Sequence, residues 1–261
     1  MSQKRYELAL CAAAFSSLMI THILPNTSGK FLYTIIYILA YVLPVILVML
    51  GNKSAEQRHA FIINPSKSFS LTSDGVYLCG IFFAAMLAVS IILNAVFPTP
   101  ADFSELTLYT FIVSGILAPV LEEMLWRKTV FSSLAYSGTF QAMLISSLLF
   151  GMLHSTTAGM IYAVFAGMLF SYLYSRTGSL LPCILLHMAN NISSLLTPIF
   201  PYTVYIFLAI GIISAVCAKL YQKNKCECAP KADFVPDTSA VLKSPFLYAT
   251  FFIFIIVRAW R

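Results

Sequence analysis

The sequence predicts an all-α polytopic membrane protein with eight transmembrane helices and an intramembrane active site. Its 261 residues are 59% hydrophobic and only 10% charged, which is too apolar for a soluble domain of this size. Several windows of about 20 apolar residues match a hydrocarbon core of about 30 Å, where backbone polar groups must be bonded within helices. A few ionisable residues interrupt these windows, and their cost in lipid points to function.

Short polar turns, most of them containing Gly or Pro, separate the predicted spans. The first run follows Lys4 and Arg5 as a signal peptide would, but it is long and lacks a small-x-small exit, so we expect a retained span. The last apolar run, 246–257, is short for a full span and is the candidate for a ninth helix. In chain order, the eight spans cover 8–24, 31–50, 76–97, 106–136, 139–154, 158–175, 179–196 and 202–221.

Charged residues in the loops predict the orientation of the chain. If the spans alternate, Lys53, Arg58 and Lys67 fall on one side of the membrane, and Asp102 and Glu105 fall on the other. The positive-inside rule then places the N-terminus in the cytoplasm. We expect an integral protein of a bacterial cell membrane.

The remaining composition excludes some classes of protein. The basic residues behind the net charge of +6 form no stripe, so we expect no nucleic-acid partner. Cys226 and Cys228 form a lone C-x-C, which falls short of a structural zinc site, and their role stays open. No polar segment is long enough to fold alone. We therefore expect one membrane domain, with N-terminal helices in 1–104, a catalytic core in 105–198 and a C-terminal part in 199–261.

An ionisable cluster lies in the fourth apolar run. Glu122, Glu123 and Arg127 each cost about 2.5 to 3.5 kcal/mol in a membrane helix, so they need partners or a task. Glu123 and Arg127 are i and i+4 and share a helical face, whereas Glu122 is turned by about 100°. We expect Arg127 to hold Glu123 while Glu122 faces elsewhere. Pro119 removes one backbone hydrogen bond and exposes a carbonyl about one turn earlier.

Two further polar pairs lie in later runs. Phe150 and His154 are i and i+4, as are His187 and Asn191, so each pair follows one helical stripe. Counted from the turns at 1.5 Å per residue, Glu122 and His154 both lie about 24 Å deep, and His187 and Asn191 about 14 and 20 Å. These depths overlap if the tip of the long fourth helix protrudes beyond the lipid. A single intramembrane His is more often a helix contact than a catalyst, but the joint pattern predicts one shared layer.

The three motifs resemble those of one family. E-E-x-x-x-R begins at Glu122, F-x-x-x-H at Phe150 and H-x-x-x-N at His187, in this order and at family-like spacing over about 115–196. Together they resemble the CAAX protease and bacteriocin-processing (CPBP, or Abi) family of intramembrane endopeptidases. The resemblance implies a peptide-bond hydrolase whose active site opens toward the cytoplasm.

The resemblance also implies a role for each residue. Glu122 and His154 would activate the attacking water, and His187 and Asn191 would stabilise the oxyanion. The supporting residues would be Glu123, Arg127 and Phe150. Family members are described both as metal-independent glutamate proteases and as metalloproteases. We favour a mechanism without a cofactor, and the alternative is a zinc ion on Glu122, His154 and His187.

Other functions compete with proteolysis. The chain could be a non-catalytic membrane scaffold or a bacteriocin-immunity protein. A proton-coupled transporter would also use buried Glu and His, although no internal repeat is present. As partners we expect the lipid bilayer and a membrane-associated peptide or protein, such as a signal or bacteriocin leader peptide rather than a prenylated one. The oligomeric state stays open.

Overall fold

A computed structural model describes residues 3–26, 29–51, 71–98, 107–135, 138–223 and 242–259. Every regular element in these ranges is helical, which confirms the all-α fold. Within them, five helices are long and apolar enough to cross a membrane. They are α2 (Lys30–Gly51), α5 (Ser73–Val96), the composite helix Leu108–Leu134, α10 (Thr157–Thr177) and α12 (Thr203–Lys223).

Four further apolar helices in the same ranges are shorter. At 1.5 Å per residue, the three of them with 14, 15 and 17 residues reach only about 21 to 26 Å, which is less than the hydrocarbon thickness. The fourth, at the N-terminal end of the chain, has 16 residues and continues directly into a π-helical segment, η1 (Met19–Ile23). The predicted count of eight spans is therefore not confirmed, although each predicted apolar run forms a helix close to its predicted place. The shorter helices are α1 (Gln3–Leu18), α9 (Thr139–Met152), α11 (Leu180–Leu196) and α14 (Pro245–Ala259).

The chain divides into two compact units. The composite helix and α10 each contribute residues to both of them. The predicted boundaries at 104 and 198 stay a prediction. The first unit comprises Met1–Pro65, Leu121–Ser171 and Phe234–Arg261, and the second comprises Ser66–Val120 and Tyr172–Asp233.

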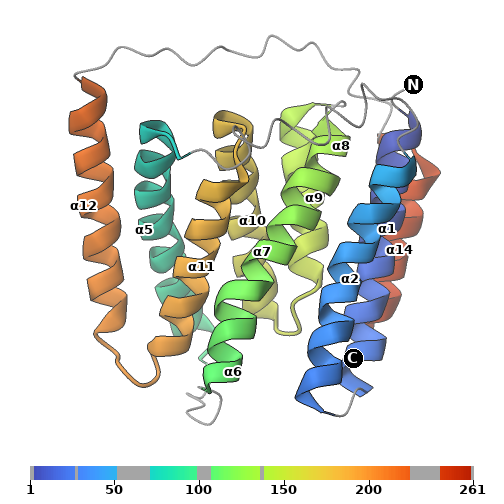
Figure 1. The fold of residues 1–261 in the computed structure, drawn as a ribbon, viewed down its shortest axis with the longest axis horizontal. Coiled ribbons are helices and arrows are strands. Elements are labelled where there is room, and N and C mark those ends of the chain that lie inside the picture. The colour runs from blue at the N-terminus through green and yellow to red at the C-terminus, as the bar shows by residue number, and fades with distance from the viewer. Residues whose placement is uncertain are drawn as a thin grey trace. The chain divides into compact units, whose positions relative to one another are not determined.

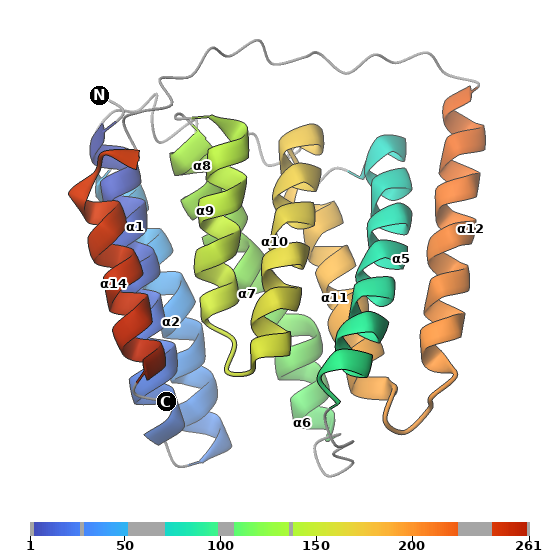
Figure 2. The ribbon, with the colours of Figure 1, turned by 180° about the vertical axis from the view of Figure 1, so that it is seen from behind.

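In the first unit, α1 lies side by side with α2 and with α14 (Figures 1 and 2). The core of the first unit forms where the composite helix meets α9, and there the side chains of Trp126 and Leu149 are 0% exposed. Small residues bring α9 and α10 close together, because a methyl group added at Gly167 would lie 3.0 Å from the Cβ of Ser147. The backbone of α9 is thereby held at a fixed distance from α10.

In the second unit, α5 lies along α12 (Figure 2). The backbones approach closely at Gly80 and Gly211, and the rings of Phe83 and Phe207 meet edge to face at 5.8 Å. Gly178 adopts a φ of +65°, which lets the chain turn from α10 into α11. α11 also packs against α5, so it lies within the body of this unit.

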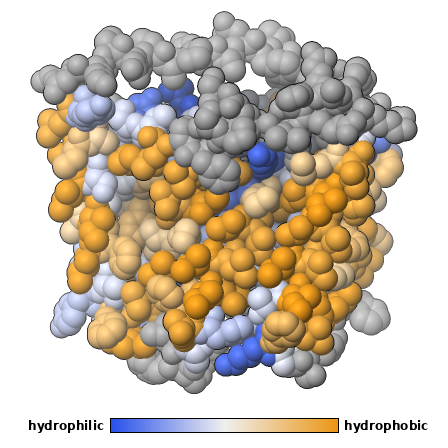
Figure 3. Space-filling model, viewed as in Figure 1, coloured by the Kyte–Doolittle hydropathy of each residue, from blue (hydrophilic) through white to orange (hydrophobic). Residues whose placement is uncertain are grey.

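Apolar side chains cover most of the surface of the face drawn in Figure 3. Phe31, Leu108 and Tyr202, for example, are 76–81% exposed. An apolar surface of this extent is typical of helices that face lipid rather than water. The charged loops that carry Lys53, Arg58, Lys67, Asp102 and Glu105 lie outside the described residues, as do Cys226 and Cys228, so the orientation in the membrane stays a prediction.

Candidate active site

The composite helix that carries the two glutamates is irregular on both sides of them. Its central part, α7 (Ala118–Glu123), lies between two π-helical segments, η3 (Phe111–Leu117) and η4 (Met124–Phe131). π-helical turns are rare and occur frequently at functional sites. In η3 the N–H of Ala118 donates to the carbonyl of Val113, five residues earlier. This widened turn ends directly before a proline.

Pro119 leaves a backbone acceptor open within this turn. In the π-helical register the next hydrogen bond would join the nitrogen of Pro119 to the carbonyl of Ser114, but proline has no N–H. The Ser114 carbonyl oxygen instead accepts a hydrogen bond of 2.9 Å from Nδ2 of Asn191, in α11. This contact confirms the expectation that Pro119 exposes a carbonyl about one turn earlier, and it shows which side chain uses it.

The amide of Asn191 is held from two sides. Its Oδ1 accepts a hydrogen bond of 3.3 Å from Nδ2 of Asn190, and its Nδ2 donates to Ser114. An amide nitrogen carries two N–H groups, so the second can donate to another acceptor. His187, one turn earlier in α11, is 5% exposed. The predicted pair His187 and Asn191 therefore lies on one stripe of a regular helix within the second unit.

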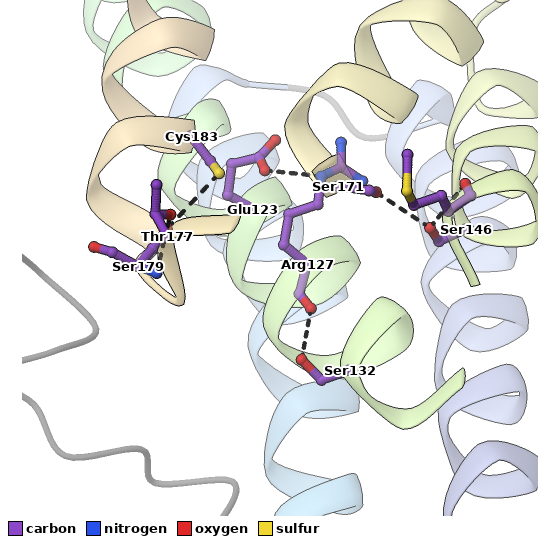
Figure 4. A network of polar contacts seen from close by, with 9 residues as sticks. Glu123, Arg127, Ser132, Ser146, Ser171, Thr177, Ser179 and Cys183 are labelled. Atoms are coloured by element: carbon purple, nitrogen blue, oxygen red, sulfur yellow. Dashed lines mark hydrogen bonds and ion pairs between the residues drawn. The ribbon is translucent and has the colours of Figure 1, made fainter. Parts of the chain in front are cut away.

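Glu123 and Arg127 form the expected ion pair inside the first unit. Nε of Arg127 lies 3.0 Å from Oε2 of Glu123, and both side chains are 0% exposed (Figure 4). The guanidinium also lies over the rings of Phe150 and Phe170, at 5.2 and 5.4 Å from their centroids. Its two amino groups have no hydrogen-bond partner among the residues that the structure describes, so these ring faces are their electrostatic partners.

Phe150 connects this ion pair to His154. The Phe150 side chain is 3% exposed, and its ring lies 5.8 Å from the ring of Trp126 and 5.3 Å from that of His154. The prediction that His154 lies in the helix was wrong by two residues, because α9 ends at Met152. The chain still completes a turn there, since the N–H of His154 donates to the carbonyl of Gly151, and so the imidazole stays against Phe150.

Glu122 faces elsewhere than Glu123, as the 100° offset predicted, and the structure shows that its partners lie on α2. Its side chain is half-buried, and its Oε1 accepts hydrogen bonds from the hydroxyls of Tyr37 at 2.9 Å and Tyr41 at 3.3 Å. These two tyrosines were not among the predicted site residues. The available signal was their spacing, because Tyr33, Tyr37 and Tyr41 recur every four residues within one apolar run and so share a helical face.

The predicted site residues are thus distributed over the two units. Glu122, Glu123, Arg127, Phe150 and His154 belong to the first unit, whereas His187 and Asn191 belong to the second. Contacts run from Glu123 through Arg127 and Phe150 to His154, while Glu122 contacts the tyrosines of α2, so the proximity of Glu122 and His154 stays a prediction. The single layer that joins both groups stays a prediction. Neither unit by itself gathers three His, Cys, Asp or Glu side chains around one point among its described residues, so no zinc ligand set forms within a unit.

Fold and site together define a helical integral membrane protein with two acids and one imidazole of the predicted site on its apolar helices and a second imidazole just after one of them. Residues 104–193 match the family of type II CAAX prenyl endopeptidase Rce1-like proteins. This match covers the three motifs from which the family was predicted, and so it confirms that resemblance over the central helices.

One curated relative supports the same family. "Putative membrane peptidase YdiL" of Bacillus subtilis (strain 168) is 38% identical to this chain over 82 residues. The aligned part is 31% of this chain and 33% of that protein, so the chain matches about a third of the relative's length. No solved structure matches the chain significantly.

Proposed function

We propose that the chain is an intramembrane endopeptidase of the glutamate type, in which Glu122 and His154 activate the attacking water. The observation that carries this proposal is the surroundings of Glu122. This half-buried carboxylate is held by two neutral hydroxyls, whereas the neighbouring Glu123 is paired with a cation. A carboxylate that accepts hydrogen bonds from phenols keeps its negative charge and can take a proton, which is what a general base must do.

The proposed reaction uses the protein groups alone. Glu122 takes a proton from water while the water oxygen bonds to the peptide carbonyl carbon. When the tetrahedral intermediate collapses, the C–N bond breaks and the proton passes to the leaving amine. His154 orients the water, and the ring of Phe150 fixes the position of that imidazole.

The oxyanion of the intermediate needs donors aimed at the developing charge. His187 and Asn191 are proposed for this role, supported by the burial of His187 and by the fixed amide of Asn191. Removing one such donor in other enzymes costs about 10²–10³ in rate. Glu123 and Arg127 are proposed to hold the helix in place rather than to react.

The substrate is proposed to be a membrane-associated peptide. The family description points to a prenylated CAAX peptide, and a signal or bacteriocin leader peptide is the expected substrate in a bacterial membrane. Trapping on the Glu122→Gln protein, followed by mass spectrometry of the co-purified peptides, distinguishes these sources. The unmutated protein should cleave the trapped peptide at one bond, and the Glu122→Gln protein should retain it uncut.

Two outcomes would reject this proposal. If Glu122→Gln protein retains full biological activity, the chain acts as a non-catalytic scaffold, an immunity protein or a transporter. If the purified protein contains one zinc per chain and loses cleavage with chelation, the metal-independent form of the mechanism is wrong. Elemental analysis of the unmutated protein is therefore part of the same experiment.

A further inference from the structure

The tyrosines of α2 form a part of the site that lies outside all three motifs. We propose that Tyr37 and Tyr41 are positioning residues that hold Oε1 of Glu122, so that Oε2 is the oxygen that takes the proton from water. This inference rests on the proposed function, because it assigns a task to the general base of that reaction. It names two residues that no spacing relative to Glu122 would identify.

Burial explains why these hydroxyls need a partner. Tyr37 is 8% exposed and Tyr41 is 2% exposed, within a helix of membrane-spanning length. A buried hydroxyl without a hydrogen bond is costly, and membrane tyrosines usually lie at the interfaces, where water satisfies them. Here both hydroxyls donate to one carboxylate oxygen. The Glu122 carboxylate therefore gives both buried hydroxyls a hydrogen-bond acceptor, and the hydroxyls give the carboxylate two donors.

The two bonds differentiate the carboxylate oxygens. A carboxylate oxygen offers about two lone-pair sites, and the hydroxyls of Tyr37 and Tyr41 occupy both of those on Oε1. A water that must lose its proton to Glu122 therefore meets Oε2. The phenols also stabilise the negative charge without neutralising it, unlike the guanidinium that pairs with Glu123.

Ring packing holds the hydroxyls in place before any substrate binds. The rings of Tyr37 and Tyr41 lie 5.1 Å apart at 60°, and the ring of Tyr33 stacks on Tyr37 at 6.3 Å. A Tyr→Phe change keeps these ring contacts and removes only the hydroxyl. The three tyrosines therefore offer matched single-atom substitutions along one helix face.

A measurement without substrate tests the bonds themselves. The infrared difference between unmutated and Glu122→Gln full-length protein in lipid nanodiscs gives the carboxylate stretching band of Glu122. We expect Tyr37→Phe and Tyr41→Phe each to shift this band, because the frequency depends on the donors to each oxygen. Tyr33→Phe, which removes a hydroxyl one turn further along the row, should leave it in place.

A kinetic measurement tests the positioning role. With a fluorogenic peptide that ends in a farnesylated Cys-a-a-X sequence as the probe, each of the two changes should lower kcat about tenfold, the effect of losing one hydrogen bond to a charged group. KM should change little, because both hydroxyls donate to Glu122 and are therefore not needed to bind the peptide. Tyr33→Phe should retain the kcat of the unmutated protein.

The outcomes separate this inference from the proposed function. An unshifted band in both variants overturns the inference even if Glu122→Gln protein is inactive. A shifted band with unchanged kcat also overturns it, because the bonds would then have no part in catalysis. A protein that does not cleave the probe counts against that substrate, and the infrared band then decides the inference alone. Size-exclusion profiles identify a variant that fails to fold, and the other Tyr→Phe variant then serves in its place.

Discussion

Two adjacent acids on the composite helix Leu108–Leu134 have opposite surroundings. Glu122 is half-buried and accepts hydrogen bonds from neutral phenols of α2, whereas Glu123 is 0% exposed and lies 3.0 Å from the guanidinium of Arg127. One residue along a helix turns the side chain by about 100°. That rotation is enough to give two neighbouring carboxylates different partners, and so to separate the proposed general base from the carboxylate of a buried ion pair.

The largest expected effect is on the cleavage rate, and it comes from changing Glu122. The change Glu122→Gln should lower the rate of peptide cleavage by about 10²–10⁴, because it removes the proposed general base and keeps the shape of the side chain. The thermal unfolding midpoint in detergent should stay close to that of the unmutated protein, since the glutamine oxygen still accepts from a tyrosine. A variant that both unfolds early and loses activity would mean that Glu122 has the structural role assigned to Glu123.

The change Glu123→Ala should act on stability. It leaves the guanidinium of Arg127 buried without its carboxylate, and breaking a buried ion pair from one side costs about 3 to 5 kcal/mol. We expect a low yield and an earlier unfolding transition, measured by thermal unfolding in detergent.

A double change provides the control for Glu123→Ala. Replacing both partners, Glu123→Leu with Arg127→Met, removes the unpaired charge and should recover much of the lost stability. If the double variant is no more stable than Glu123→Ala, the defect does not arise from the stranded guanidinium. The ion pair would then contribute less to stability than its burial suggests, and Glu122 and Glu123 would differ less in their structural role.

A smaller effect concerns the backbone of the same helix. The change Pro119→Ala supplies an N–H that can donate to the Ser114 carbonyl and so compete with Asn191. We expect kcat to fall about tenfold, the effect of one displaced hydrogen bond, with stability unchanged or increased. In an Asn191→Ala background the same change should have no further effect on kcat, and an additive loss would contradict this coupling.

The smallest expected effect is on stability, and it concerns the two rings that lie against Arg127. The changes Phe150→Leu and Phe170→Leu each remove one ring from the guanidinium and should each cost about 0.5 to 2 kcal/mol in stability. Phe150 also contacts His154, so Phe150→Leu should reduce cleavage beyond its effect on stability. The test compares the cleavage rates of the two variants at a temperature where both are folded. Equal rates would contradict the role proposed for Phe150.

Hydrophobic length and turn residues predicted the helices well. The second apolar run, predicted at 31–50, forms α2 over Lys30–Gly51, and the seventh, predicted at 179–196, forms α11 over Leu180–Leu196. Apolar composition did not predict which helices reach the full thickness of a membrane. The fifth apolar run continues to His154, so the predicted helix was extended to that residue. In the structure α9 ends two residues earlier, at Met152, just before the polar break.

By itself, the sequence determined the helical class, the resemblance of its central helices to one family and the pairing of Glu123 with Arg127. Each of these depends on composition or on spacing within a few residues, where helix geometry alone brings side chains together. The tertiary structure alone decided that Tyr37 and Tyr41 meet Glu122, across 85 and 81 residues, and that Asn191 meets the Ser114 carbonyl, across 77. Contacts over such separations depend on which helix faces pack against each other, and no local pattern of residues contains that information.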